Sequence, residues 1–192
     1  MRSFALALLL LSSSAFAAQK PPALTAQKPP VTPQQRLNDL FGQLAQVQEP
    51  DDAKPIEGEI NAIFAQSGSP SVDVLMSRAQ AALNANKVDV ARKLVEAITR
   101  IAPDFAEGWH RLAALQAQAK DDRGAMISLQ RTITLNPRHF TAYAELAGFL
   151  EDYGDKPGAL KLLRKALALD PKMENVDKEV KGLARDVEGE GI

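Results

Sequence analysis

Apolar residues recur at helical spacing along most of the chain, and polar residues fill the positions between them. The first stripe follows the spacing i, i+3, i+4, i+7 and i+10, and it consists of Leu37, Leu40, Phe41, Leu44 and Val47. A second, shorter stripe consists of Ile56, Ile60, Ile63 and Phe64. Residues at this spacing share one face of a helix, so the pattern predicts a pair of amphipathic helices over residues 33–70.

Beyond residue 70 the pattern repeats with a period of 34 residues. The period is marked by three prolines, Pro103, Pro137 and Pro171. Other positions carry chemically matched residues at the same spacing: Trp109 and Tyr143, Leu112 and Leu146, Ala113 and Ala147, Ala125 and Ala159, and Leu129 and Leu163. A shared period over matched residues indicates a stack of similar supersecondary units.

The residue types explain how one unit would fold. A large aromatic residue opens the first helix, and a leucine three positions later lies on the same face. Small alanines allow the two helices of a unit to approach closely. Proline then ends the unit because it cannot donate to the helical hydrogen-bond ladder. We therefore expect Trp109 to pack in the interior, whereas the alternative role for such a ring is stacking on a ligand.

Capping residues fall where these helices are expected to begin and end. Asp121 and Asp155 precede second helices, where an acidic side chain is favoured. Gly154 stands at the end of a first helix and can adopt the left-handed conformation that closes it. We expect Asp104 to cap the first helix that carries Trp109, with Glu107 three residues later as its reciprocal partner.

These residues resemble the tetratricopeptide-repeat family, whose pattern is W-x₂-L-G-x₂-Y, then A-x₃-F, then P over 34 residues. The resemblance implies three repeats within residues 71–173, at 72–105, 106–139 and 140–173. The first is weaker, because Arg78 occupies the usual leucine position. The implied fold is all-α, a right-handed superhelical stack of antiparallel helix pairs. Residues 33–70 would then be a cap or a degenerate fourth repeat.

A last apolar stripe follows the repeats, and it consists of Val176, Val180, Leu183 and Val187. Polar residues fill the positions between them. A helix with one apolar and one solvated face is what an open stack needs at its end. The sequence therefore predicts a C-terminal capping helix and tail over residues 174–192.

The first residues have the three regions of an export signal. Arg2 supplies a positive charge, residues 4–11 are apolar, and the AFA sequence at 15–17 gives a small-x-small cleavage pattern. We expect a signal peptide at 1–17, with an uncleaved anchor as the alternative, and hence a protein of the periplasm or a secreted one. Residues 18–32 contain AQKPP twice and are typical of a Pro-rich linker, although a PP pair can also dock into an aromatic groove.

The amino-acid composition excludes several classes of chemical function. The 192 residues are 45% hydrophobic, include no cysteine and carry a formal net charge of −1. Lack of cysteine excludes disulfides and thiol catalysis, and the balanced charge argues against nucleic-acid binding. For the two histidines, His110 and His139, we identify no His, Asp or Glu partner at zinc-ligand spacing on the same face. No nucleotide-binding or hydrolase motif occurs, so we predict neither an enzyme nor a cofactor or metal site.

The resemblance also implies a concave groove lined by the first helices. Its candidate residues are Asp73, Met76, Gln80, Leu83, Glu107, His110, Gln118, Thr141, Glu151 and Asp152. Family members that hold chaperone tails clamp a terminal carboxylate with Lys, Arg and Asn. These candidate positions include no Lys or Arg, so a neutral or basic peptide or protein of the cell envelope is the expected partner. For any one of these residues, plain solvent exposure is the alternative.

Two other functions are also compatible with the sequence. One is a self-associating structural protein, a homodimer or a chain whose residues 33–66 fill the groove. The other is a non-catalytic accessory subunit of an envelope enzyme complex. No stable membrane insertion is expected after signal cleavage, because no later apolar run is long enough to span a bilayer.

Overall fold

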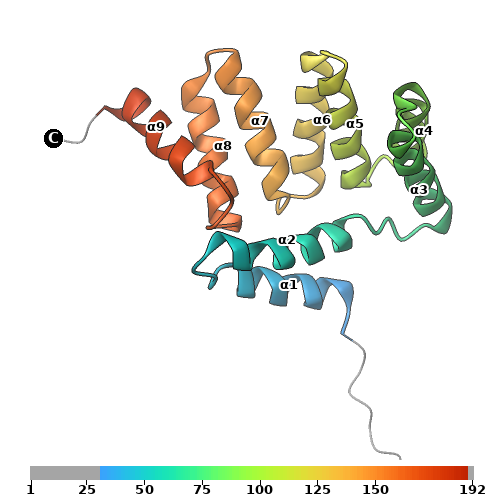
Figure 1. Cartoon of the computed structure of the whole chain (residues 1–192), viewed down its shortest axis with the longest axis horizontal. Coiled ribbons are helices and arrows are strands. Elements are labelled where there is room, and N and C mark those ends of the chain that lie inside the picture. Colours follow the sequence, from blue (N-terminus) through green and yellow to red (C-terminus); the bar gives the residue numbers. More distant parts are fainter. Residues whose placement is uncertain (1–30, 190–192) are drawn as a thin grey trace, which may run out of the picture. The chain divides into compact units, whose positions relative to one another are not determined.

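The computed structural model describes residues 31–189, so the expected signal peptide and most of the linker lie outside the described residues. Within residues 31–189 every regular element is a helix (Figure 1). The helices are α1 (Pro33–Leu44), α2 (Pro50–Phe64), α3 (Pro70–Asn84), α4 (Val88–Ile101), α5 (Ala106–Gln118), α6 (Asp122–Leu135), α7 (Phe140–Asp152), α8 (Lys156–Leu169) and α9 (Val176–Glu188). The all-α prediction is confirmed.

Three antiparallel pairs form the stack, α3 with α4, α5 with α6, and α7 with α8 (Figure 1). Successive pairs meet through α4 and α5 and through α6 and α7. The periodic alanines lie inside the pairs, and Ala125 and Ala159 are fully buried beside buried Leu129 and Leu163. Small residues at these positions let the helix axes approach, as the repeat pattern predicted.

Helix α9 covers the last pair. Val176 and Leu183 are buried against α8, and charged residues stay on the outer face. The guanidinium of Arg164 donates two hydrogen bonds to the Glu188 carboxylate, of 2.6 and 2.8 Å. This confirms the predicted capping helix.

None of the helices between residues 31 and 189 combines the length and the apolar character needed to cross a bilayer.

The ends of the first helices share one backbone feature. Gly154 has a positive φ of 85°, as predicted, and Asn86 and Lys120 adopt φ of 60° and 63° at the equivalent positions. The side chains of Asp121 and Asp155 accept hydrogen bonds from backbone N–H groups at the start of α6 and α8, which confirms both caps. Left-handed closure is therefore a property of the repeat, and it does not require glycine at each position.

The predicted capping box at the start of α5 is wrong. Phe105 is the N-cap residue of α5, and no side chain caps this helix. Its ring is buried with Val72 and Ile98 in the joint between the first two pairs. Apolar packing of Phe105 thus sets where α5 begins, and Glu107 turns to other partners.

Helices α1 and α2 form a hairpin that lies across the turns of the later repeats (Figure 1). Their apolar stripes pack on Phe140, at the start of α7, and on Leu169 and Met173, after α8. The Arg138 guanidinium stands 3.8 Å from the centre of the Phe41 ring. The hairpin therefore joins the stack by contacts with residues about 100 positions further along the chain, an arrangement that the stripes alone did not specify.

A pair of acidic side chains lies where α2 meets the end of α8. Asp170 is fully buried. Burial and the nearby charge of Asp170 raise the pKa of Glu57, on α2, to about 7; Lys54 opposes this shift and Glu174 adds to it. The hairpin is thus docked on a site whose charge changes between acidic and neutral pH.

Candidate functional site

The first helices α3, α5 and α7 lie side by side and enclose two hollows that meet at α5. A cavity of about 350 Å³ separates α3 from α5, and we call it the α3–α5 cavity. Its lining includes Met76, Gln80, Leu83, Arg111, Ala114 and Gln118. A second space of about 320 Å³, the α5–α7 hollow, is lined by Ala113, Ala114, Ala117, Leu129, Glu145, Gly148, Phe149 and Asp152. Ala114 is exposed and borders both, so the two hollows form one groove along the first helices.

The structure brings five of the expected groove residues into these hollows. Met76, Gln80, Leu83 and Gln118 line the α3–α5 cavity together, and Asp152 lines the α5–α7 hollow. Two apolar side chains and two primary amides therefore line one partly open cavity. Such a lining offers an apolar pocket together with donors and acceptors for a peptide backbone.

Three other expected residues lie outside both hollows. The Asp73 carboxylate accepts a 2.6 Å hydrogen bond from the Ser67 hydroxyl, so it fastens the segment between α2 and α3. Glu151 lies towards α9, where its charge adds to the burial that raises the pKa of Glu179. Thr141 is half-buried at the start of α7. None of these three residues therefore lines the groove.

Glu107 and His110, the last two expected groove residues, belong to a group of interacting side chains that we call the histidine–glutamate cluster: Glu107, His110, His139 and Glu145. Glu107 and His139 are buried, whereas the Glu145 side chain is exposed. Glu107 Oε2 lies 3.3 Å from His139 Nε2 and 3.5 Å from His110 Nδ1. His110 Nε2 lies 3.1 Å from Glu145 Oε2, and the centres of the two imidazole rings are 4.4 Å apart. The cluster ties α5 to α7 and to the turn before α7.

The hydrogen bonds of His139 determine which ring nitrogen carries the proton. Its Nδ1 accepts the backbone N–H of Ala142 at 3.3 Å and so caps α7. The proton of the neutral ring therefore sits on Nε2, which donates it to Glu107. Phe64 of α2 stacks on the other side of this ring, with 5.2 Å between ring centres.

Burial and pairing pull the pKa values in the cluster apart. Burial alone would lower the pKa of His110, but its close contact with the Glu107 carboxylate, its 3.1 Å contact with Glu145 and the charges of both carboxylates raise it to about 9. Burial lowers the pKa of His139 and outweighs its contact with Glu107. Burial opposes ionisation of Glu107, yet His110, His139 and Arg111 together hold its pKa well below the usual range. At neutral pH, cationic His110 thus lies between two carboxylates, beside a neutral His139.

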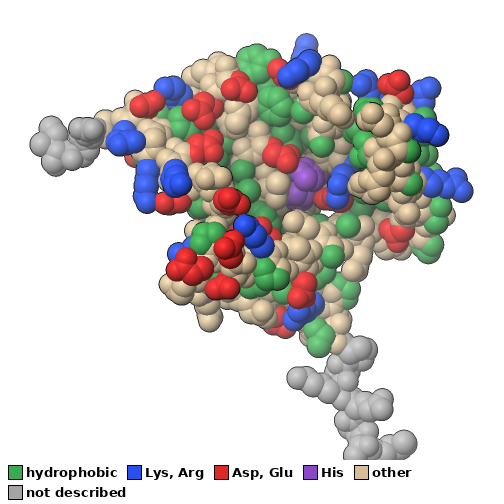
Figure 2. Space-filling model, viewed as in Figure 1, with side chains coloured by type: hydrophobic (Ala, Val, Ile, Leu, Met, Phe, Trp, Pro, Cys, Tyr) green, Lys and Arg blue, Asp and Glu red, His purple; other side chains and the backbone are tan. Residues whose placement is uncertain are grey.

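Sequence reasoning missed three residues of this region, His139, Glu145 and Arg111. Glu107 and His110 are three residues apart on one helical face, so the conclusion that His110 lacks a carboxylate partner was wrong. Arg111 does line the α3–α5 cavity, but its Nε donates a 2.7 Å hydrogen bond to Glu107. Figure 2 shows a histidine surface in the recess above the α1–α2 hairpin, with acidic and basic side chains on either side.

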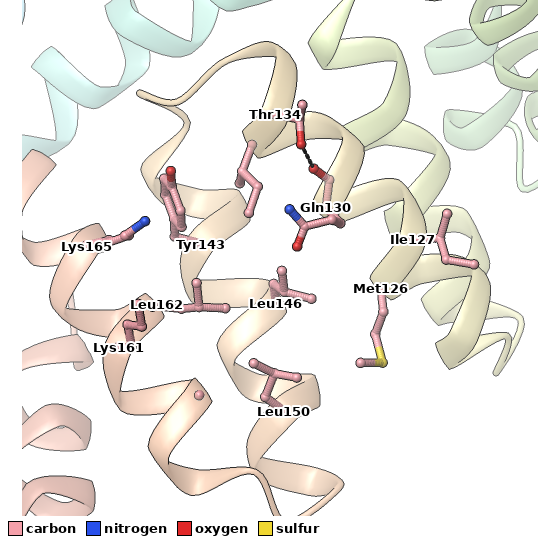
Figure 3. A pocket seen from close by; sticks show the side chains of 12 residues that line it. Met126, Ile127, Gln130, Thr134, Tyr143, Leu146, Leu150, Lys161, Leu162 and Lys165 are labelled. Carbon is pink, nitrogen blue, oxygen red and sulfur yellow. Dashed lines mark hydrogen bonds between the residues drawn. The ribbon is translucent and has the colours of Figure 1, made fainter.

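A third hollow, of about 650 Å³, lies away from the first-helix groove, between α6 and α8 (Figure 3). Tyr143, Leu146 and Leu150 of α7 form its floor, and Lys161 and Lys165 stand on the α8 side. None of the expected groove residues lines it. Its floor consists of the packing positions of the third repeat, so this surface follows from how α6 and α8 splay over α7.

Comparison with known proteins places the chain among repeat proteins. It is 30% identical over 183 residues to a TPR repeat-containing protein of Rhizobium etli, and the match covers 94% of this chain and 90% of the relative. No family model matches the chain. The identity and coverage of the Rhizobium etli relative show that the chain belongs to the tetratricopeptide-repeat family.

Solved structures support the same fold. MamA aligns with 74% of this chain and 87% of its own, with a TM-score of 0.56 and 16% identity. The Yersinia enterocolitica type III secretion chaperone SycD, in complex with a peptide of the translocator YopD, aligns with 62% of this chain and 94% of its own. Its TM-score is 0.53 and its identity 18%. At these identities the neighbours show the fold alone.

Proposed function

We propose that this chain is an exported protein-interaction module of the cell envelope, which binds a peptide segment in the groove formed by α3, α5 and α7. The observation that carries the proposal is the α3–α5 cavity, where Met76 and Leu83 meet Gln80 and Gln118. A partly open apolar pocket beside amide groups suits one apolar anchor of a peptide and the polar backbone next to it. The role is binding without catalysis.

The charge of the groove indicates the kind of peptide. Glu145 and Asp152 line the α5–α7 hollow, whereas the one basic residue of the α3–α5 cavity, Arg111, is already paired with Glu107. Electrostatic complementarity selects against an acidic partner at such a surface. The favoured ligand is a neutral or basic segment that places an apolar side chain between α3 and α5 and its basic residues over α7.

Two further observations support this function. The complex of SycD with a translocator peptide shows that a neighbour of this fold holds a peptide. The signal-like residues 1–17 are the ground for proposing export to the periplasm, or secretion as the alternative.

Ala114 offers a direct test because it is exposed and borders both hollows. Ala114→Arg would fill the groove and add a positive charge without disturbing the core. Ala168→Arg is the matched control, since Ala168 is also an exposed helical alanine but lies on α8 and lines none of the hollows described above. Both variants should melt within a few degrees of the parent.

The assay is affinity capture from an envelope extract, followed by direct binding of the recovered partner's peptides. We expect Ala114→Arg to lose the partner and Ala168→Arg to keep it. Equal recovery with both variants would refute the groove as the binding site. Light scattering on the same samples separates self-association, because a dimer broken by Ala114→Arg would mean that a second copy occupies the groove.

A further inference from the structure

We propose that Glu107, His110 and His139 form a binding site for a divalent transition-metal ion of the zinc class. The site lies at the joint between the second and third repeats. Among the described residues these three offer one ligand atom each, all within 4.8 Å of one another. They come from α5 and from the turn before α7, so an ion held here would connect two consecutive repeats.

The distances within the cluster match the edges of a zinc coordination tetrahedron. Zinc bonds to nitrogen and carboxylate oxygen are about 2.0–2.1 Å long, which places neighbouring ligand atoms about 3.3 Å apart. Glu107 Oε2 lies 3.3 Å from His139 Nε2 and 3.5 Å from His110 Nδ1. The two edges that share the carboxylate are thus already formed, and the remaining adjustment is a closer approach of the two imidazole nitrogens.

The residues around these three atoms are arranged as outer partners of a metal site. His110 Nδ1 is buried and makes no hydrogen bond within the described chain, while its Nε2 lies 3.1 Å from Glu145 Oε2. A carboxylate on the far nitrogen is the arrangement that orients a metal-ligating histidine. Arg111 Nε donates to Glu107 Oε1 at 2.7 Å, so it fixes the carboxylate and leaves Oε2 for an ion.

Both histidines limit the affinity of the site. His110 is cationic at neutral pH and must release its Nδ1 proton before that nitrogen can coordinate an ion. Coordination through Nε2 of His139 requires the ring proton to move to Nδ1, and the Ala142 N–H then loses its 3.3 Å hydrogen bond to that nitrogen. The same N–H keeps the carbonyl oxygen of residue 139 as an acceptor at 3.1 Å. The ring itself need not move, because Phe64 stacks on it and holds its plane. We therefore expect a weaker site than one with two unengaged histidines.

The ligand set selects the class of metal. Two imidazole nitrogens and one carboxylate suit zinc, cobalt and nickel, whereas magnesium and calcium prefer oxygen ligands throughout. Three protein ligands leave the fourth position of a tetrahedral ion to water or to another ligand. Glu145 also lines the α5–α7 hollow, so the cluster adjoins the proposed groove.

The test uses the full mature chain after removal of metals with a chelator, and it needs no peptide partner. Titration with Zn²⁺ should give one saturable site by calorimetry. At a hundredfold excess over Kd it should raise Tm by about 5–10 °C. Titration with Co²⁺ should give the visible absorption of a four-coordinate ion. His110→Gln should abolish this binding, and Glu145→Gln should weaken it by about 10–100-fold.

Glu57→Gln is the matched control, because it removes a carboxylate from a separate acidic pair and should leave Zn²⁺ binding unchanged. Circular dichroism shows whether His110→Gln stays folded, and the Co²⁺ spectrum of the unsubstituted chain tests the site even if it does not. Absence of saturable binding to the unsubstituted chain overturns the proposal. Zn²⁺ binding that survives in a folded His110→Gln variant also overturns the proposal. The proposed peptide-binding function stands or falls separately, with the Ala114→Arg experiment.

Discussion

Replacement of Glu107 by glutamine tests whether the histidine–glutamate cluster holds the second repeat to the third. Glu107→Gln keeps the size of the side chain and removes its charge. The Glu107 side chain is 6% exposed and faces Arg111, His139 and His110 at 2.7, 3.3 and 3.5 Å. An amide offers one acceptor oxygen to these donors, and its own N–H₂ group points at one of them.

The expected loss in the free energy of unfolding follows from the buried donors that Glu107→Gln leaves without a charged partner. Loss of one partner of a buried ion pair costs about 3–5 kcal/mol. His110 can avoid part of that cost by giving up its proton, because the pKa of about 9 depends on Glu107. We therefore expect Glu107→Gln to lower the free energy of unfolding by about 2–4 kcal/mol and Tm by about 5–15 °C.

The assay is urea unfolding at neutral pH with a chelator present, so that no metal contributes. Glu145→Gln is the control, since the Glu145 side chain is 41% exposed and its loss should cost less than about 1 kcal/mol. A loss for Glu107→Gln no larger than that of Glu145→Gln would refute the reasoning, because the buried carboxylate would then contribute no more than an exposed one.

Three further predictions concern packing, pH and backbone. Trp109→Ala should cost about 3 kcal/mol in urea unfolding, at the low end for such a change, because the half-buried ring packs in the joint between the first and second repeats and donates its Nε1–H to the Pro103 carbonyl. Glu57 has a folded pKa of about 7, above its ordinary value of 4.5, so the stability it contributes is complete below pH 4.5 and is lost as pH rises to 7. Glu57→Gln should remove about 1 kcal/mol of that pH dependence, a value reduced because the carboxyl is largely solvated. Lys120→Gly should raise stability by about 0.5–1 kcal/mol, because Lys120 occupies a left-handed conformation.

Each of these has an outcome that contradicts it. An unchanged melt for Trp109→Ala would place the ring outside the packed joint. Parallel pH–stability curves for the parent and Glu57→Gln would show that Glu57 has the same pKa in the folded and the unfolded chain. A destabilised Lys120→Gly, with Asn86→Gly as the comparison at the equivalent turn, would mean that the Lys120 side chain makes contacts that outweigh its backbone strain.

The repeat itself could be predicted from the sequence because its signals are local. The spacing of Ala125 and Ala159, the aspartates at 121 and 155 and the glycine at 154 each act within one helix pair. Local signals are read directly from order along the chain. Asp104 is the exception, because burial of Phe105 between two repeats decided where α5 starts.

The docking of the α1–α2 hairpin and the histidine–glutamate cluster could not be predicted in the same way. Phe41 packs on Phe140, and Glu107 meets His139, so both features depend on contacts between distant segments. An apolar stripe predicts that a face will be buried but does not say against what. For the cluster, the Glu107–His110 pair was visible on one helical turn, and only the path of the α6–α7 turn brings His139 to it.

The expected groove residues show the same difference between repeat geometry and contacts of distant segments. Met76, Gln80, Leu83 and Gln118 meet in one cavity, because repeat geometry places equivalent positions of adjacent first helices together. Glu107 and His110 lie on the same side of α5, but they contact each other, His139 and Glu145 within the histidine–glutamate cluster. Charged residues at expected groove positions can thus form ion pairs between repeats, and the repeat register alone does not predict this.

In-cell photocrosslinking from Gln118 is the decisive test of whether the groove formed by α3, α5 and α7 binds an envelope protein. Gln118 is exposed and lines the α3–α5 cavity, and a photoreactive residue at Ala168 on α8 serves as the control. We expect Gln118 to capture one recurrent envelope protein through a neutral or basic segment, and Ala168 not to capture it. Identical products from both positions, or products from Gln118 that contain only this chain, would contradict it.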